Sequence, residues 1–282
     1  MPVVTLYTYG KDQTGNTVSA ISLATFIGLT KNKKTLLLST GYKDKTVSES
    51  FWPIVEQKKS IFGGNTNMPK QNNIFQRGID DLDRMVKSNR LSPDIITNYT
   101  RVALRDRLEI IDSYMGNPEQ YEQMQTSYPK IIAAAGKYYD NVIVDIDKRL
   151  SGKTKMEILN VSDIVLAMSV QKMHNIRELN ALIESEKILK KDKTLITLGR
   201  YDKNMKYNAK NLSRSVLKQR NIIDTIPYNF KVAEAVQEGR IIDVIFGIIN
   251  LRNADENFFL VQELQRLVDD INSKVLQLEM RR

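Results

Sequence analysis

The stretch YTYGKDQTGNTVSA, residues 7–20, follows a short apolar run and leads into a pattern typical of a helix. Gly10, four further residues, Gly15, Asn16 and Thr17 match the spacing of a phosphate-binding loop. In such a loop the glycines let backbone N–H groups approach an anion at a helix N-terminus. The motif normally has lysine where Asn16 stands. The sequence therefore predicts a phosphate-type loop that keeps its glycines and its hydroxyl but lacks the usual cation.

Short apolar runs alternate with helical patterns along the rest of the chain. Most of the runs are continuous, as in strands that are buried on both faces of a parallel sheet. The predicted strands are residues 3–8, 35–40, 108–112, 141–147, 163–169, 194–199 and 221–227, and the predicted helices are residues 17–31, 79–89, 121–138, 175–191 and 257–282. Residues 63–73 are rich in Gly and Asn and predict a loop. The alternation favours a doubly wound, mostly parallel α/β sheet flanked by helices, and without a clear linker we expect residues 1–282 to form one domain.

Composition excludes several kinds of site. The 282 residues include no Cys and one His, which excludes disulfides, thiolate chemistry and a multi-histidine metal site. No apolar run approaches the roughly 20 residues of a transmembrane helix, and no signal-peptide pattern is present, so we expect a cytoplasmic protein. The formal net charge of +9 favours anionic partners.

The loop sequence GKDQTGNT, residues 10–17, resembles the loop of the ParA/MinD family, which has the pattern G-K-G-G-x-G-K-T. Lys11 matches the extra "signature" lysine of that family. Asp12 and Gln13 replace two glycines, and Asn16 replaces the ordinary loop lysine. The resemblance implies a P-loop NTPase-like fold whose loop is altered at its most charged position.

Three further segments extend the resemblance over almost the whole chain. KKTLLLSTGYKD (33–44) is similar to the family's second strand, which usually ends in D-x-D, and Ser39 and Gly41 stand at those two carboxylate positions. YYDNVIVDIDKRL (138–150) is similar to the Walker B region, where Asp145 matches the family's Asp. IIDTIPYNFKVAEAVQEGRIIDV (222–244) resembles the stretch near the bound base. LEIIDSYMGNPEQYEQM (108–124) also resembles the TadZ/CpaE branch.

The resemblance implies ATP and Mg²⁺ as ligands and a face-to-face homodimer in which each signature lysine reaches the partner's phosphate. The residues that it implies for nucleotide binding are Gly10, Lys11, Gly15, Asn16 and Thr17, and those for Mg²⁺ are Thr17 and Asp145. No catalytic residue is assigned, because Gly41 replaces the carboxylate that positions water. Asp44 is the nearest carboxylate after it. Asp145 also has a plain structural interpretation, as a strand-end carboxylate that caps a neighbouring loop.

A basic stretch lies between residues 187 and 220. Clustered Lys and Arg side chains contact phosphates without reading sequence, so this stretch is a candidate surface for non-specific DNA or for an acidic protein partner. A solvated helix face is the structural alternative. The candidate surface comprises Lys190, Lys191, Lys193, Lys203, Lys206, Lys210, Arg214 and Lys218. A membrane-lying C-terminal helix is not expected, because that segment carries Glu263, Asp269, Asp270 and Glu279.

Three hypotheses follow. In the leading one the chain is a degenerate ParA/MinD-like protein, a pseudo-ATPase that acts as a dimerising positioning, partition or scaffold module. The second is an active ATPase with relocated catalytic groups. The third is a nucleotide-free module that binds DNA or protein.

Overall fold

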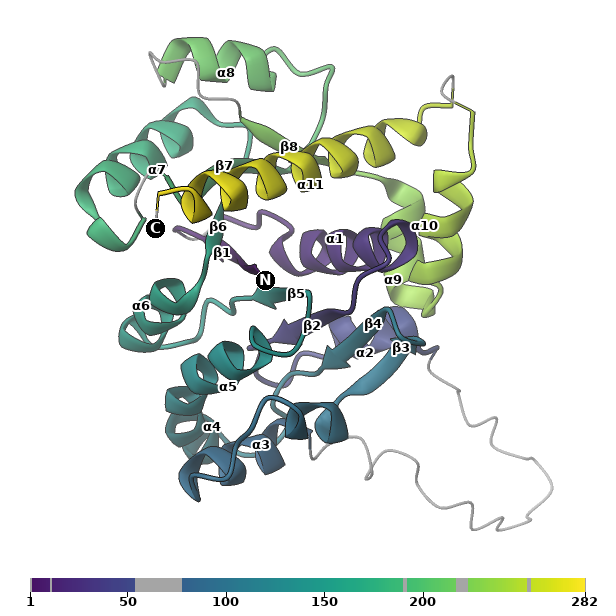
Figure 1. The fold of residues 1–282 in the computed structure, drawn as a ribbon. Helices are drawn as coiled ribbons and strands as arrows, with labels where there is room; N and C mark the ends of the chain where they lie inside the picture. The colour runs from purple at the N-terminus through teal and green to yellow at the C-terminus, as the bar shows by residue number, and fades with distance from the viewer. Residues whose placement is uncertain are drawn as a thin grey trace, which may run out of the picture.

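The computed structural model describes residues 2–10, 12–53, 78–189, 192–216, 223–252 and 255–281. Within them, one eight-stranded sheet has the order β3-β4-β2-β5-β1-β6-β7-β8 (Figure 1). All neighbouring strands are parallel except β3, which runs antiparallel to β4. The strands are β1 (Val3–Thr8), β2 (Thr35–Ser39), β3 (Arg101–Leu104), β4 (Leu108–Ile111), β5 (Asn141–Asp145), β6 (Ile164–Ser169), β7 (Thr194–Tyr201) and β8 (Asp224–Pro227).

Helices cover both faces of the sheet and form two separate hydrophobic cores. One face is covered by α1 (Asn16–Thr30), α2 (Thr46–Phe51), α9 (Phe230–Glu238), α10 (Ile241–Ile249) and α11 (Phe258–Glu279). The other face is covered by α3 (Gly78–Lys87), α4 (Pro118–Met124), α5 (Tyr128–Ala135), α6 (Gly152–Val161), α7 (Met173–Ser185) and α8 (Ala209–Val216). The predicted fold class, a doubly wound and mostly parallel sheet flanked by helices, is confirmed.

The central strand β1 is apolar because it faces both cores. Val3 and Tyr7 belong to one core, and Val4 and Leu6 belong to the other. β1 pairs in parallel with β5, and β5 pairs in parallel with β2. The carboxyl ends of these three strands therefore lie side by side, so the loops that follow them meet at one edge of the sheet.

Three sequence predictions differ from the structure. The edge strand β3 was not predicted, because it is only four residues long and is partly exposed. The helix predicted over residues 121–138 is instead α4, a 3-10 segment (Gln125–Ser127) and α5. Pro129, which lacks an N–H group, lies in the first turn of α5, where no donor is needed. The helix predicted to residue 191 ends at Ser185. The loop predicted over 63–73 lies outside the described residues.

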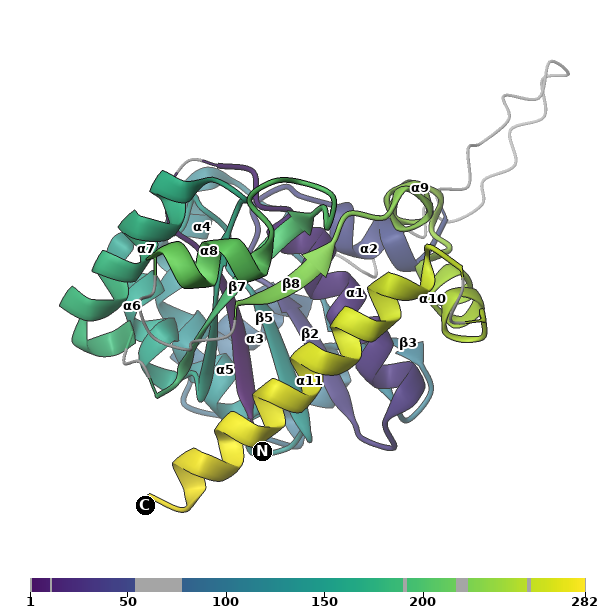
Figure 2. The same cartoon turned by 90° about the horizontal axis from the view of Figure 1, so that it is seen from above.

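The C-terminal helix α11 packs along β8 and α1, and one face of it is buried between Leu260 and Ile271. Figure 2 shows its last turns extending beyond the sheet. In the part of the chain that the structure describes, no helix is both long and apolar enough to cross a membrane.

Candidate functional site

The loop after β1 is built around two glycines in the left-handed backbone region, Gly10 with φ of 81° and Gly15 with φ of 73°. Gly15 has a second requirement, because a Cβ there would lie 2.9 Å from Cγ of Arg200. Gly15 directly precedes α1, and no side chain caps the first turn of that helix. The first-turn N–H groups are thus left without a side-chain acceptor, as in helices that receive an anion at this end.

Asn16 and Thr17 lie against the carboxylate of Asp145. The Asn16 side-chain amide donates to Oδ1 of Asp145 over 2.6 Å and to the carbonyl oxygen of Leu6 over 3.3 Å. The Thr17 side chain is a second hydrogen-bond donor to Asp145. Two adjacent predicted site residues, Asn16 and Thr17, are therefore in direct contact with a third, Asp145, which lies 129 and 128 positions further along the chain. Asn16 occupies the lysine position of the loop but points back toward the sheet.

Asp145 is only 5% exposed, at the carboxyl end of β5. Its pKa is raised to about 6, mainly by burial and to a lesser extent by the charges of Asp44 and Asp147, while the Thr17 and Asn16 hydrogen bonds act in the opposite direction. A buried carboxylate beside a hydroxyl is an oxygen donor set of the kind that magnesium prefers. Among the described residues, no group of three or more His, Cys, Asp or Glu side chains is placed to hold a metal ion.

Asp12 does not bring its negative charge into the loop interior. Its carboxylate pairs with Lys172 Nζ at 3.3 Å and accepts from the Asn175 side chain at the start of α7. The Lys172 hydrogen bond is the main reason that the pKa of Asp12 lies below its usual value, with smaller contributions from Asn175 and His174. The side chain that sequence reasoning expected to oppose a phosphate is thus tied to a different element. Lys11 lies outside the described residues.

The position of Gly41, where the family has its second carboxylate, has no room for a side chain. A Cβ at Gly41 would lie 2.5 Å from Oγ of Ser113 and 3.2 Å from Oγ of Ser39. The two serine hydroxyls hydrogen-bond each other at 2.9 Å, and the Gly41 N–H donates to Ser39. A side chain at this position would displace Ser113, so the packing around Gly41 does not accommodate a carboxylate.

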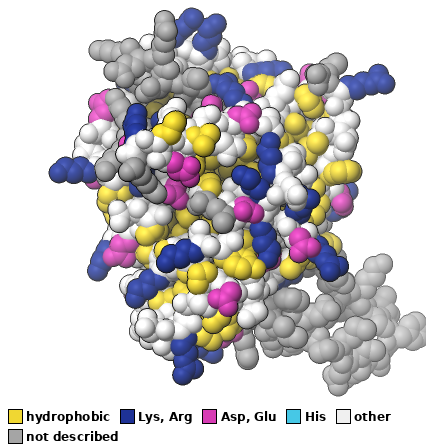
Figure 3. Space-filling model, in the orientation of Figure 1, with side chains coloured by type: hydrophobic (Ala, Val, Ile, Leu, Met, Phe, Trp, Pro, Cys, Tyr) yellow, Lys and Arg dark blue, Asp and Glu magenta, His cyan; other side chains and the backbone are white. Residues whose placement is uncertain are grey.

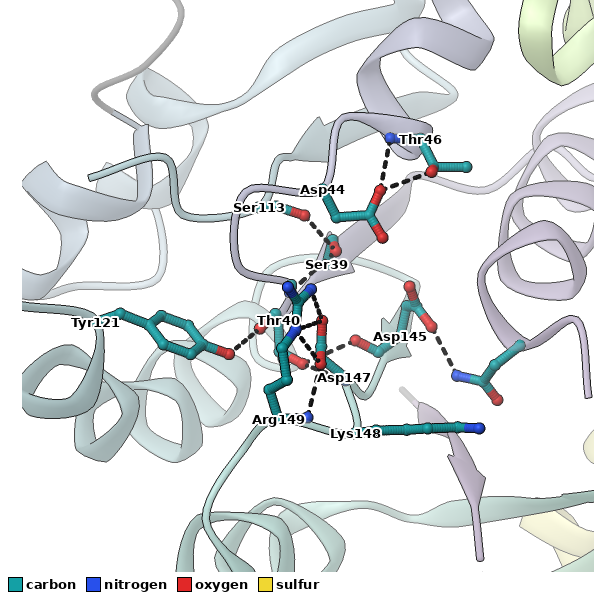
Figure 4. Close-up of polar contacts among 12 residues, drawn as sticks. Ser39, Thr40, Asp44, Thr46, Ser113, Tyr121, Asp145, Asp147, Lys148 and Arg149 are labelled. Carbon is teal, nitrogen blue, oxygen red and sulfur yellow. Dashed lines mark hydrogen bonds and ion pairs between the residues drawn. The ribbon is translucent and has the colours of Figure 1, made fainter. Parts of the chain in front are cut away.

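Asp44 is the first carboxylate after Gly41 in the chain. Its Oδ1 accepts hydrogen bonds from the backbone N–H and the hydroxyl of Thr46 at the start of α2. Figure 4 shows the carboxylates of Asp44 and Asp145 on the same side of the end of β2, with Asp147 and Arg149 on the other side. Asp44 therefore faces the same space as Asp145, although one of its oxygens is used as a helix cap.

The turn after β5 supplies residues that the sequence analysis did not select. Asp147 is held by Arg149 in an ion pair at 2.5 Å, and its N–H donates to the Thr40 hydroxyl over 2.8 Å. Burial would raise the pKa of Asp147, but the hydrogen bonds and charge of Arg149 outweigh it and hold the pKa below its usual value. Lys148 Nζ donates to the backbone carbonyl of Asp12. The only sign of this cluster in the sequence is the pair of consecutive basic residues, Lys148 and Arg149, shortly after Asp145.

A second unpredicted group lies where β7 and β8 end. Arg200 has a positive φ of 51° and packs over Gly15. Its guanidinium carbon lies 5.9 Å from the ring centroid of Tyr228, a side chain that is 57% exposed. The preceding Gly199 is required, because a Cβ there would lie 2.0 Å from the Thr14 carbonyl oxygen. These residues bring the ends of β7 and β8 to the loop from the side opposite Asp145.

The structure divides the basic stretch. Lys203, Lys206, Lys210 and Arg214 are exposed and follow β7 or lie on α8. Lys193 lies at the other end of β7 and donates to the carbonyls of Leu159 and Ser162, so it is not brought together with them. Lys190, Lys191 and Lys218 lie outside the described residues. Figure 3 shows Lys and Arg side chains spread over this face of the molecule among carboxylates.

Solved structures that resemble this one are ParA and MinD proteins. A ParA family ATPase from Chlorobium tepidum TLS superposes with a TM-score of 0.64 at 14% identity, covering 97% of this chain and 98% of its own. The cell division ATPase MinD of Pyrococcus furiosus gives 0.62 at 12% identity, with coverage of 96% and 100%. The chain has the ParA/MinD fold.

A third structure with this fold contains a ligand. The septum site-determining protein MinD of Pyrococcus horikoshii OT3, complexed with Mg-ADP, gives a TM-score of 0.55 at 11% identity, covering 86% of this chain and 92% of its own. No protein-family model matches the ParA/MinD-like chain, and no curated protein matches its sequence. The likeness therefore lies in the fold, whereas the loop and its neighbours have diverged in sequence.

Proposed function

We propose that this chain is a ParA/MinD-like positioning or scaffold module that binds Mg-ATP, hydrolyses it at a rate near background and dimerises. The observation that carries the proposal is the contact of Asn16 and Thr17 with the buried Asp145, directly below the glycine loop. The candidate Mg²⁺ ligands Thr17 and Asp145 lie together. Asn16 and Gly41 replace the groups that the family uses for the chemical step.

The residues present fit a nucleotide with its magnesium ion. Gly10 has open space on the side where a Cβ would project, and α1 begins without a side-chain cap. Gly10, Lys11, Gly15, Asn16 and Thr17 would hold the phosphates, and Thr17 and Asp145 would hold Mg²⁺. A bound Mg²⁺ ion would neutralise phosphate charge, and it usually takes its remaining ligands from phosphate oxygens and water.

We expect ATP turnover near background. Gly41 carries no water-positioning carboxylate, and Asn16 supplies no charge for the developing negative charge on the phosphate. Contacts of this kind are each worth about 3 kcal/mol, or roughly a hundredfold in rate. Phosphate release by the purified protein is the measurement. A rate typical of a ParA ATPase would overturn the proposal if Asp145→Ala abolished it. If Asp44→Asn also abolished it, the alternative of an active ATPase with a relocated carboxylate, favoured by the position of Asp44, would be supported.

We expect dimerisation that depends on Lys11. In the family the signature lysine reaches across the dimer to the partner's phosphate, so Lys11→Ala should weaken the Mg-ATP-dependent dimer about tenfold. The melting temperature should change little, because a lysine that acts across a dimer contributes little to the fold of the monomer. Sedimentation equilibrium at several concentrations measures both species, with Lys153→Ala on an exposed face of α6 as the control. A wild type that stays monomeric with Mg-ATP, or a variant that dimerises equally well, contradicts this role.

A second candidate function is non-specific DNA binding, favoured by the exposed Lys203, Lys206, Lys210 and Arg214. Affinity for DNA falls as the salt concentration rises, and each lysine that contacts a phosphate steepens the slope of log affinity against log salt concentration by about 0.9. Lys206→Gln with Lys210→Gln should therefore lower that slope by roughly two on short duplexes of unrelated sequence. Lys130→Gln with Lys153→Gln, both exposed, is the matched control. An unchanged slope, or an equal loss in the control, excludes this surface.

A further inference from the structure

Asn16 cannot supply the charge that its position normally provides. Its side-chain N–H groups donate to the Asp145 carboxylate over 2.6 Å and to the Leu6 carbonyl oxygen. Its side-chain oxygen accepts from the Thr8 hydroxyl over 3.3 Å. The side chain is thus directed to the sheet by three polar contacts. A triphosphate at this loop would therefore lack the charge that a lysine at position 16 supplies, unless another element provides it.

Lys148 is placed to provide that charge. It comes from the turn after β5, three residues beyond Asp145, and its ammonium group donates to the Asp12 carbonyl in the loop. Figure 4 shows its side chain extended away from Asp147 and Arg149. This contact is to a main-chain carbonyl, and the carboxylate of the same residue, Asp12, is bound by Lys172 and Asn175.

The turn that carries Lys148 is held on several sides. The N–H of Asp147 donates to Thr40 over 2.8 Å, and the Asp147 carboxylate accepts the Arg149 N–H over 2.7 Å. Lys155 Nζ donates to the carbonyl oxygen of Lys148 itself over 2.6 Å. The backbone at Lys148 is therefore held relative to β2 and α6, so the fold sets the point from which its side chain extends.

We propose that Lys148 is the phosphate-binding cation of this site, acting from the loop after β5 in place of a lysine at position 16. The inference rests on the proposed function, because it assigns one charge of the same nucleotide site. The ligand class is a nucleoside di- or triphosphate. The charge of Lys148 should matter more as the number of phosphates increases.

The test measures the affinity of ATP and AMP in the presence of Mg²⁺, by competition with a fluorescent ATP analogue. Lys148→Met keeps the length of the side chain and removes its charge, and it should weaken ATP binding at least tenfold while changing AMP binding much less. Lys153→Met, an exposed lysine on α6, should bind as the wild type does. Lys148→Arg should retain most of the affinity. A thermal melt of each variant checks that the fold is intact.

A double variant separates charge from loop positioning. If Lys148 supplies charge, a lysine at position 16 should replace it, so Lys148→Met should cost less than about threefold in an Asn16→Lys background. Equal losses in both backgrounds would mean that Lys148 only holds the loop through the Asp12 carbonyl, and would overturn the inference. Wild-type affinity in Lys148→Met would also overturn it and would leave the proposed function standing. A wild type that binds no ATP would overturn both.

Discussion

Asp224→Asn should raise the free energy of unfolding by roughly 3 kcal/mol at pH 7.5 and by about 1 kcal/mol at pH 5. Asp224 is 1% exposed on β8, where it faces α11, and neither carboxyl oxygen has a hydrogen-bond donor among the described residues. Its pKa is raised to about 8, mainly by burial and also by its interaction with Asp270 and the charge of Glu263, while the charge of Arg266 acts in the opposite direction. The folded protein therefore keeps this carboxyl group neutral at pH 7.

The sign follows from proton counting. Between about pH 4 and pH 8 the folded state holds a proton that the unfolded chain has released, so stability falls as the pH rises through that range. Asparagine is neutral throughout this pH range, so it has no such proton to lose. Urea unfolding at several pH values is the measurement, with Asp106→Asn as the control, because that side chain is exposed and its φ of 58° suits asparagine. A pH-independent gain, or a loss of stability at pH 7.5, would contradict the buried neutral carboxyl.

Asn16→Lys should tighten ATP binding about ten- to a hundredfold. A charged hydrogen bond contributes about 1.5–3 kcal/mol, which corresponds to that range of affinity. The glycine turn and the uncapped start of α1 are already present, so the substitution adds the missing charge without needing a new backbone. In the wild type, the Asn16 side chain lies 2.6 Å from Asp145. In the variant, the ammonium group of the new lysine would stabilise the ionised form of Asp145.

One further variant serves as the control for this result. Asn16→Met has a similar length without charge, so it should not tighten binding and should lose the contact with Asp145. Isothermal titration of both variants with Mg-ATP is the measurement. If Asn16→Lys binds ATP no more tightly than the wild type, the new lysine is paired with Asp145 and does not reach a phosphate. The missing charge at position 16 would then not be what limits the affinity for ATP.

The strands and the central contact could be predicted from the sequence because both depend on local patterns. The run VVTLYT predicts β1 with the bounds that the structure has, since a strand facing two cores must be continuously apolar. The order of strands in a phosphate-loop fold then places residue 16 beside Asp145. The plain structural interpretation of Asp145, as a strand-end carboxylate that caps a neighbouring loop, agrees with the hydrogen bond that it accepts from the loop residue Asn16.

The remaining features depend on turns whose geometry no local pattern specifies. Lys148 reaches the loop only because Asp147, Thr40 and Lys155 fix the turn that carries it. Arg200 meets Gly15 through a left-handed backbone conformation that a sequence does not reveal for arginine. The burial of Asp224 likewise depends on which side of β8 is covered by α11. These contacts join segments far apart in the chain, and only the packed fold brings them together.

The central claim is that the altered loop still binds a nucleotide with Mg²⁺ held by Thr17 and Asp145. Isothermal titration of the wild type and of Asp145→Asn with ATP, each in excess Mg²⁺ and in chelator, tests it most directly. The account predicts that Mg²⁺ tightens ATP binding to the wild type by roughly tenfold or more and has little effect on Asp145→Asn, because a neutral amide is a poorer magnesium ligand than a carboxylate. No binding by the wild type in either condition, or the same Mg²⁺ dependence in Asp145→Asn, would contradict it.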